Sequence, residues 1–312
     1  MRPTIDGPIA ASLKGRLGNQ LFQFAAALSL QPDDRPVPVD SRWAPPGSGG
    51  RGSLFACLRR EAVRELSQSE LVLLGQVPRL LRGSSRIERL RAAAARRLPI
   101  IDSRIFTERS PFSYDSRVLA LRGPILLSGY FQNEQYFRDV RAKLRSAFRP
   151  ASTAARAWWM ELERRAAGRR LVAVAFRDAP DYAALGWVLP DHYYRAALTA
   201  LSVEPGECVF AVFGDSYSHN MARAISLLGE DLVLASAHGL SVPDQLSAQS
   251  MFDTQIIANS TFSWWGAWLA DADRGFTAEI VAPAPWVGAD DEGPVPARWR
   301  AIRRTVGPSA CR

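Results

Sequence analysis

The sequence predicts an α/β protein built on parallel, doubly wound sheets. Its second half alternates short apolar runs rich in β-branched residues with longer segments of helical periodicity, a pattern typical of parallel sheets covered by helices. The chain has 312 residues, and single cores rarely grow beyond about 250–300 residues. The break at residues 150–153, which contain Pro150 and Ser152, therefore predicts two domains, residues 1–152 and 153–312.

The composition is that of an ordinary globular protein, with 47% hydrophobic and 22% charged residues. We find no run of about 18–20 apolar residues that could span a membrane and no secretory apolar segment near the start, so we expect a cytoplasmic protein. The net charge of +8 comes from arginine, because Lys14 and Lys143 are the only lysines. This charge is consistent with nucleic acid, an anionic membrane or a small anionic substrate. Without zinc-finger spacing or an RNA-binding aromatic motif, we expect no nucleic-acid partner.

Metal binding is not expected. The three cysteines are widely spaced and read as free thiols, and the three histidines lack ligand spacing. Asp271 and Asp273 form an acidic pair, but it lies at a predicted helix end rather than after a strand.

The elements follow from hydrophobic periodicity. In the first half we predict strands at residues 8–13 and 125–127 and helices at residues 20–30 and 133–148. We also predict a glycine loop at residues 15–18, an exposed loop at residues 45–53 and a long helical region at residues 54–98. In the second half we predict strands at residues 171–176, 208–213, 232–235, 254–258 and 279–282. Helices are predicted at residues 154–167, 191–201, 217–228 and 243–252, and from Thr261 onward.

Part of the long helical region is strongly basic. Ile87, Leu90, Ala94 and Leu98 share one helical face and are surrounded by arginines. This pattern is consistent with a helix on an anionic membrane surface or with a solvated face of the first domain, and the second interpretation is favoured.

Polar residues follow several predicted strands. Arg177, Asp215 and the segment that begins at Asn259 each come directly after a strand, where parallel α/β sheets bind ligands. Ser260 or Thr261 can cap the following helix, whose positive end suits an anion, and Gly266 permits close packing. The alternative is an ordinary capped helix whose tryptophans lie in the core.

Two long strings carry a family resemblance. Residues 15–25 read GRLGNQLFQFA and residues 259–269 read NSTFSWWGAWL; both resemble the signatures of the α-1,2-fucosyltransferases. GYFQNEQYF at residues 129–137 and LPDHYYRAA at residues 189–197 are also similar to that family. In the GYFQ segment, Tyr130 and Gln132 could line the cleft, but we expect Tyr130 and Phe131 in the core.

The resemblance implies an enzyme that transfers fucose from GDP-fucose to a sugar hydroxyl, such as O2 of a galactoside, with inversion. It implies a GT-B-like fold of two Rossmann-like domains facing a cleft, with no metal or other cofactor. Residues 1–152 would form the acceptor-side domain and residues 153–312 the GDP-sugar-binding domain. The acceptor would be a glycan or lipid-linked glycan, met in the cytoplasm or at the inner face of the membrane.

The resemblance also suggests roles for single residues. Arg177 would meet the charge that grows on the leaving diphosphate, although an interdomain ion pair is the alternative, and Asp178 or Asp181 would take the acceptor proton. Asp215 would bind guanine or ribose, or cap a helix, and Trp187 would contact the acceptor. The remaining donor-binding residues would be Gly18, Asn19, Gln20, Asn259, Ser260, Thr261, Phe262 and Ser263.

One motif departs from the family pattern. The family has His-x-Arg-Arg-Gly-Asp-Tyr, whereas this chain has Ala175 for the histidine, keeps Arg177, and has Asp178 for the second arginine. Gly214-Asp215 also lacks one acidic residue of the pattern. A catalytically impaired or donor-shifted relative that still binds a sugar nucleotide is therefore the alternative to an active fucosyltransferase.

Overall fold

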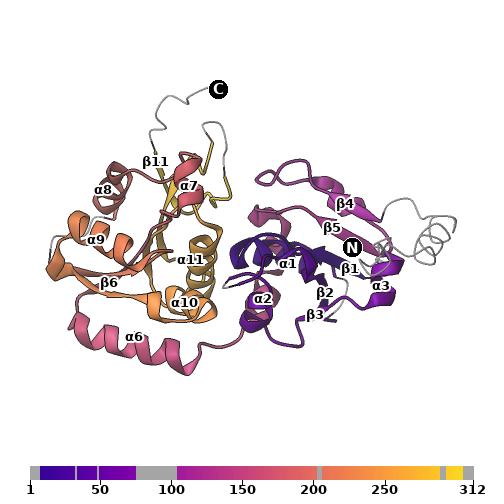
Figure 1. The fold of residues 1–312 in the computed structure, drawn as a ribbon, viewed down its shortest axis with the longest axis horizontal. Coiled ribbons are helices and arrows are strands. Elements are labelled where there is room, and N and C mark those ends of the chain that lie inside the picture. The colour runs from indigo at the N-terminus through magenta and orange to yellow at the C-terminus, as the bar shows by residue number, and fades with distance from the viewer. Residues whose placement is uncertain are drawn as a thin grey trace, which may run out of the picture. The chain divides into compact units, whose positions relative to one another are not determined.

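The computed structural model describes residues 8–31, 34–47, 49–74, 104–201, 206–288 and 293–304. Contacts group the chain into two compact units (Figure 1). The first comprises Met1–Phe131 and Gln135–Phe148, and the second comprises Gln132–Glu134 and Arg149–Arg312. The three-residue segment joins the second unit because Glu134 accepts hydrogen bonds there from Trp268 Nε1 at 2.9 Å and from Arg298 at 2.6 Å.

Among the described residues of the first unit, five parallel strands form a sheet of order β3-β2-β1-β5-β4. The strands are β1 (Ile9–Ser12), β2 (Val37–Asp40), β3 (Val63–Glu65), β4 (Ile105–Thr107) and β5 (Ile125–Ser128). The helices are α1 (Leu17–Leu30), α2 (Ser53–Cys57), α3 (Gln68–Leu73) and α5 (Arg141–Ala147), with short 3-10 turns between elements.

The second unit contains a parallel sheet whose described strands have the order β11-β10-β9-β6-β7-β8. They are β6 (Arg170–Ala175), β7 (Cys208–Phe213), β8 (Val233–Ser236), β9 (Thr254–Ile256), β10 (Glu279–Ala284) and β11 (Arg300–Arg303). From β6 the chain moves outward to β8, then crosses back to β9 on the other side of β6. The strand order therefore reverses between β6 and β9, which is where doubly wound sheets bind ligands.

Helices cover both faces of this second sheet (Figure 1). They are α6 (Thr153–Ala166), α7 (Pro180–Ala184), α8 (Asp191–Ala200), α9 (Tyr217–Leu228), α10 (Val242–Gln249) and α11 (Thr261–Asp273). Alternation along β6 explains the two layers. Val172, Val174 and Phe176 pack under α8 and α9, whereas Ala173 and Ala175 pack under α6 and α10.

The predicted elements of the second half agree with the structure to within a few residues, and the α/β class is confirmed. Five described elements were not predicted from the sequence, because their short or charged segments carry little periodicity: β2, β3, β4, α7 and β11. The long helix predicted at residues 54–98 is wrong over its first part, because α2, β3 and α3 occupy residues 53–73. The basic face that contains Ile87 and Leu90 lies outside the described residues.

Two further predictions in the first unit need correction. The helix expected at residues 133–148 is replaced by 3-10 turns and the short α5. Phe131 is fully buried as expected, but Tyr130 is 39% exposed. The carboxylate of Glu108 accepts hydrogen bonds from the amides of both residues and holds Phe131 at a positive φ of 52°, so the turn directs the two rings differently.

None of the described helices combines the length and apolarity needed to cross a lipid bilayer.

Candidate active site

The side chains that follow β6, β7 and β9 gather at one edge of the second sheet. Arg177 lies just past β6, Asp215 just past β7, and Asn259 just past β9. Because β6 and β9 flank the reversal in strand order, Arg177 and Asn259 occupy the position where a ligand is expected from topology alone.

Arg177 is held by two carboxylates of its own unit. Its Nη1 is 2.7 Å from Asp215 Oδ2, and its Nη2 is 2.9 Å from Asp181 Oδ2. The side chains of Arg177 and Asp215 are only 14% and 16% exposed, whereas that of Asp181 is 62% exposed. The interdomain ion pair considered for Arg177 is therefore not what these contacts show, since both carboxylates belong to the second unit.

Asp215 also supports the backbone next to Arg177. Its oxygens accept hydrogen bonds from the amides of Asp178 at 3.3 Å and Ala179 at 3.0 Å. The expected helix-capping role is absent among the described contacts, because Ser216 is the N-cap of α9 and no side chain caps it. The carboxylate instead fixes both the guanidinium and the loop that carries it.

Tyr182 connects Arg177 to the end of β9. The guanidinium carbon lies 4.5 Å from the centre of the Tyr182 ring, and the Tyr182 hydroxyl donates to the Asn259 carbonyl at 3.1 Å. Asn259 is fully buried and donates from Nδ2 to the Trp187 carbonyl at 2.8 Å. The rings of Trp187 and Tyr182 meet edge to face at 5.5 Å, so Trp187 lies beside this cluster. Burial raises the pKa of Tyr182, and its hydroxyl stays neutral at physiological pH.

The helix start predicted from the sequence is observed, but its side chains behave differently from the prediction. Ser260 is the N-cap of α11, yet its side chain makes no capping hydrogen bond. Ser263 is buried, and its hydroxyl lies 3.1 Å and 3.0 Å from the carbonyls of Ala258 and Ser260. Its single proton is thus directed at the backbone. Ser260, Thr261 and Phe262 are partly exposed.

The tryptophans of α11 belong to the core. Trp264, Trp265 and Trp268 are fully buried. Gly266 permits the predicted close packing, since a Cβ there would lie 2.5 Å from the Gln249 side chain.

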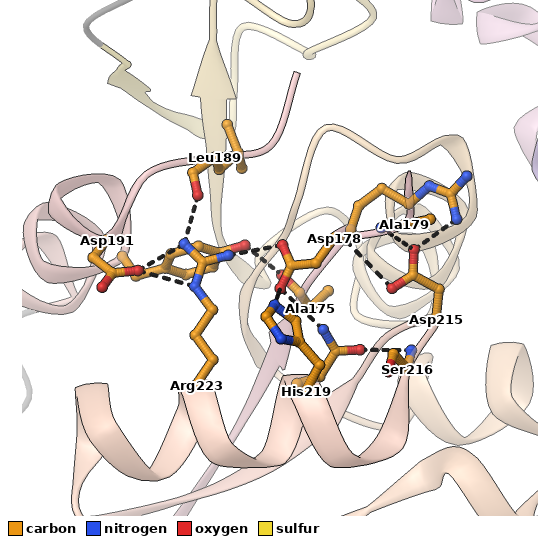
Figure 2. Close-up of polar contacts among 12 residues, drawn as sticks. Ala175, Asp178, Ala179, Leu189, Asp191, Asp215, Ser216, His219 and Arg223 are labelled. Atoms are coloured by element: carbon orange, nitrogen blue, oxygen red, sulfur yellow. Dashed lines mark hydrogen bonds and ion pairs between the residues drawn. The ribbon is translucent and has the colours of Figure 1, made fainter. Parts of the chain in front are cut away.

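The buried Asp178 carboxylate belongs to an ionic network with Arg223 and His219 (Figure 2). Its side chain is 3% exposed, with Oδ1 2.7 Å from Arg223 Nη1 and Oδ2 3.0 Å from Asn220 Nδ2. His219 Nε2 lies 3.5 Å from the same carboxylate. An arginine at position 178, as in the family pattern, would place two cations together, so Arg223 accounts for the departure.

Ala175, the other departure, does not belong to this cluster. Its side chain packs with Ala211, Phe213 and Ala248 in the apolar layer under α6 and α10. A histidine in this position would have to enter that layer, so its absence removes no group from the Arg177 cluster.

The first-unit residues lie at the start of α1. The predicted loop at residues 15–18 is wrong in extent, because α1 begins at Leu17 and includes Gly18 and Asn19. Within residues 15–18 the positive φ, 70°, belongs to Gly15, whereas Gly18 lies inside the helix. Gln20 is fully buried and donates to the carbonyls of Gly15 at 2.8 Å and Gly50 at 3.2 Å. It thus joins two loops, while donor binding by these residues stays a prediction.

No group of three or more metal-ligating side chains occurs among the described residues. Sequence reasoning missed Asn220 and Arg223, since α9 carries no motif and their partner Asp178 is distant in sequence. No local signal could have paired them.

Two known glycosyltransferases are similar to this chain in sequence. No family model matches the chain. Over 308 residues it is 26% identical to the alpha-1,2-colitosyltransferase of Escherichia coli, covering 95% of this chain and 99% of that protein. The protein is a glycosyltransferase. The O-antigen biosynthesis glycosyltransferase WbnK of Escherichia coli is 31% identical to it over 105 residues, 34% of this glycosyltransferase and 33% of WbnK.

The glycosyltransferase also resembles a solved structure. The crystal structure of POFUT1 in complex with GDP-fucose aligns with a TM-score of 0.51, covering 89% of this chain and 99% of that chain. At 12% identity the likeness concerns the fold alone, and it confirms the GT-B-like α/β fold expected from the sequence.

Proposed function

We propose that this glycosyltransferase transfers a 6-deoxyhexose from its GDP derivative to a glycan hydroxyl, O2 of a galactoside in the simplest case, with inversion and without a metal. The observation that carries the proposal is that Arg177 and the start of α11 both follow strand ends at the strand-order reversal, where the N-cap residue Ser260 makes no side-chain capping hydrogen bond. A guanidinium can bind two phosphate oxygens at once, and amides at a helix start favour anions. Together they suit a nucleotide diphosphate.

Arg177 would act on the leaving group. As the bond between the anomeric carbon and the diphosphate oxygen breaks, negative charge grows on the diphosphate, and a fixed cation stabilises it most. Asp215 is well placed to keep the guanidinium fixed, because it holds both the side chain and the adjoining backbone. The site would need no cofactor besides the GDP-sugar donor itself.

The diphosphate must take the place of one partner of Arg177, and Asp181 is the one more easily exchanged. Its carboxylate is 62% exposed, and exposed ion pairs contribute little, about 0–1 kcal/mol. Once displaced, Asp181 would be available to accept the proton of the acceptor hydroxyl as that oxygen bonds to the anomeric carbon. Asp178 is a poorer base, because Arg223 and Asn220 already occupy its oxygens.

The proposal has two forms, which differ in the donor sugar. Fucose is the donor suggested by the sequence motifs, whereas the full-length relative is a colitosyltransferase. Colitose is fucose without its 3-hydroxyl, so the two donors share the GDP group and the site proposed here. A relative that binds the nucleotide without turnover is the weaker alternative, since Ala175 packs away from the cluster.

Two measurements test the proposal. Calorimetric titration with GDP should show one site per chain, and GDP release should depend on both a donor and a galactoside acceptor. GDP-fucose and GDP-colitose compared with the same acceptors identify the donor. A chain that binds neither GDP nor the two donors does not have this function.

A further inference from the structure

Arg223 of α9 is the centre of an ionic network that reaches the segment between β6 and α7 (Figure 2). This segment, residues 176–179, is called the Arg177 loop. The Arg223 guanidinium contacts Asp178 Oδ1 at 2.7 Å, Asp191 Oδ1 at 2.7 Å and the Leu189 carbonyl at 2.5 Å. Its side chain is 14% exposed. The rings of Phe176 and Tyr194 lie 5.4 Å and 5.0 Å from the guanidinium carbon. One side chain thus joins the loop after β6 to the start of α8.

The Asp178 carboxylate depends on these contacts. It is 3% exposed and is reached by Arg223, Asn220 and the more distant His219. A buried carboxylate without its cation is strongly unfavourable, and such a group moves toward water or takes up a proton. Losing Arg223 would therefore release Asp178 from α9 rather than leave it in place.

Asp178 directly follows Arg177, so its position fixes that of its neighbour. The segment between β6 and α7 is held on one side by Asp215, which accepts from the amides of Asp178 and Ala179. On the other side it is held by the Asp178 side chain on α9. With both attachments in place, the backbone has little freedom to turn the Arg177 side chain away from Asp215.

We propose that Arg223 is a positioning residue that acts through Asp178 to keep the Arg177 guanidinium where the donor diphosphate binds. The inference rests on the proposed function for the ligand, but the positioning itself is a property of the ligand-free protein. Arg223 does not touch the substrate in this account.

The test compares Arg223→Met with the matched control Asp191→Asn. Asp191 contacts the same guanidinium, but its side chain is 54% exposed and, among the described contacts, pairs with Arg223 rather than with the Arg177 loop. Hydrogen exchange with mass spectrometry on the ligand-free proteins compares peptides over residues 176–182 with peptides over β9. We expect exchange in the loop to rise about tenfold in Arg223→Met and less than threefold in Asp191→Asn, with β9 unchanged in both.

A double variant separates positioning from general destabilisation. In Asp178→Asn/Arg223→Met no buried carboxylate loses its cation, because Asp191, the other partner of Arg223, is 54% exposed. Loop exchange should therefore return toward that of Asp178→Asn alone. The GDP affinity of the variants, measured by calorimetry, should change in the same order as loop exchange. We expect it to fall about tenfold in Arg223→Met, because the coupling between contacting residues is typically of this size. If Arg223→Met does not fold, Arg223→Lys replaces it, because the ammonium keeps the charge but cannot reach all three acceptors.

The inference is overturned if loop exchange in the folded Arg223 variant equals that of the wild type, or if β9 and the loop rise together. It is also overturned if Asp191→Asn has the same effect. A wild-type protein that binds no GDP refutes the proposed function instead, while the exchange experiment still decides whether Arg223 holds the loop.

Discussion

Replacing Arg177 by alanine removes the one side chain that the mechanism requires for the leaving group. The variant retains the α11 start, Asp215 and the acceptor side, so it loses one charge-stabilising donor pair. Loss of a single such donor in other enzymes lowers kcat by about 10²–10³-fold, or roughly 2.7–4 kcal/mol. We expect transfer by Arg177→Ala to fall within this range.

The structure indicates that the variant folds. Asp215 loses its guanidinium partner but keeps hydrogen bonds from the amides of Asp178 and Ala179, and it is not fully buried. The cost in the free energy of unfolding should therefore lie below the roughly 3–5 kcal/mol of a fully buried pair. We expect about 1.5–3 kcal/mol from the loss of a charged hydrogen bond.

The assay is the initial rate of GDP release at saturating donor and acceptor, corrected for the folded fraction measured by circular dichroism. Arg164→Ala serves as the control, because Arg164 is 72% exposed and, within the described part of the chain, its ion pair is with Glu161 on the surface of α6. The control should retain the wild-type rate. A rate for Arg177→Ala within threefold of the wild type would remove Arg177 from the mechanism.

Three further predictions concern other parts of the molecule. Asp181→Asn should lower kcat by about 100-fold, the lower end for loss of a general base, with GDP affinity by calorimetry retained; an unchanged kcat assigns the proton to another group. Gly266→Ala should lower the free energy of unfolding by about 1–3 kcal/mol in urea titrations, because the new Cβ meets the buried Gln249; equal stability would contradict that packing. In the first unit, hydrogen bonds from Arg64 lower the pKa of Glu70 to about 2 from its ordinary 4.5. Glu70→Gln should therefore cost about 1 kcal/mol at pH 7 after solvent screening, and the cost should vanish as the pH falls from about 4.5 toward 2. Denaturant titrations at pH 7 and at about pH 2 check this, and a cost at pH 2 equal to that at pH 7 would exclude the ion pair as its source.

The sequence was most informative about the second sheet. Its inner strands β6, β7, β9 and β10 are mostly buried, so they read as continuous apolar runs that stand out from amphipathic helices. β3 and β11 contain charged residues and lie at sheet edges, where one face or one edge is exposed and periodicity is weak. In the first unit the helix predicted from residue 54 merged α2, β3 and α3, since short elements share similar composition.

The site was predictable at the level of which strand ends contribute, because parallel topology brings the carboxyl ends of strands together. The contacts of single side chains were not. Asp178 and Asp181 are equivalent in sequence, both acidic and close to Arg177, yet one is 3% and the other 62% exposed. That difference depends on Arg223, which is brought to Asp178 only by the packing of α9 on the sheet.

The central claim is that Arg177 and the first turn of α11 together bind a nucleotide diphosphate. A crystal structure of the complex with GDP tests it most directly. We predict diphosphate oxygens within about 3 Å of the Arg177 guanidinium and of first-turn amides of α11, with Asp181 displaced from Arg177. A diphosphate bound elsewhere, in contact with neither Arg177 nor the Asn259–Ser263 segment, would contradict the account.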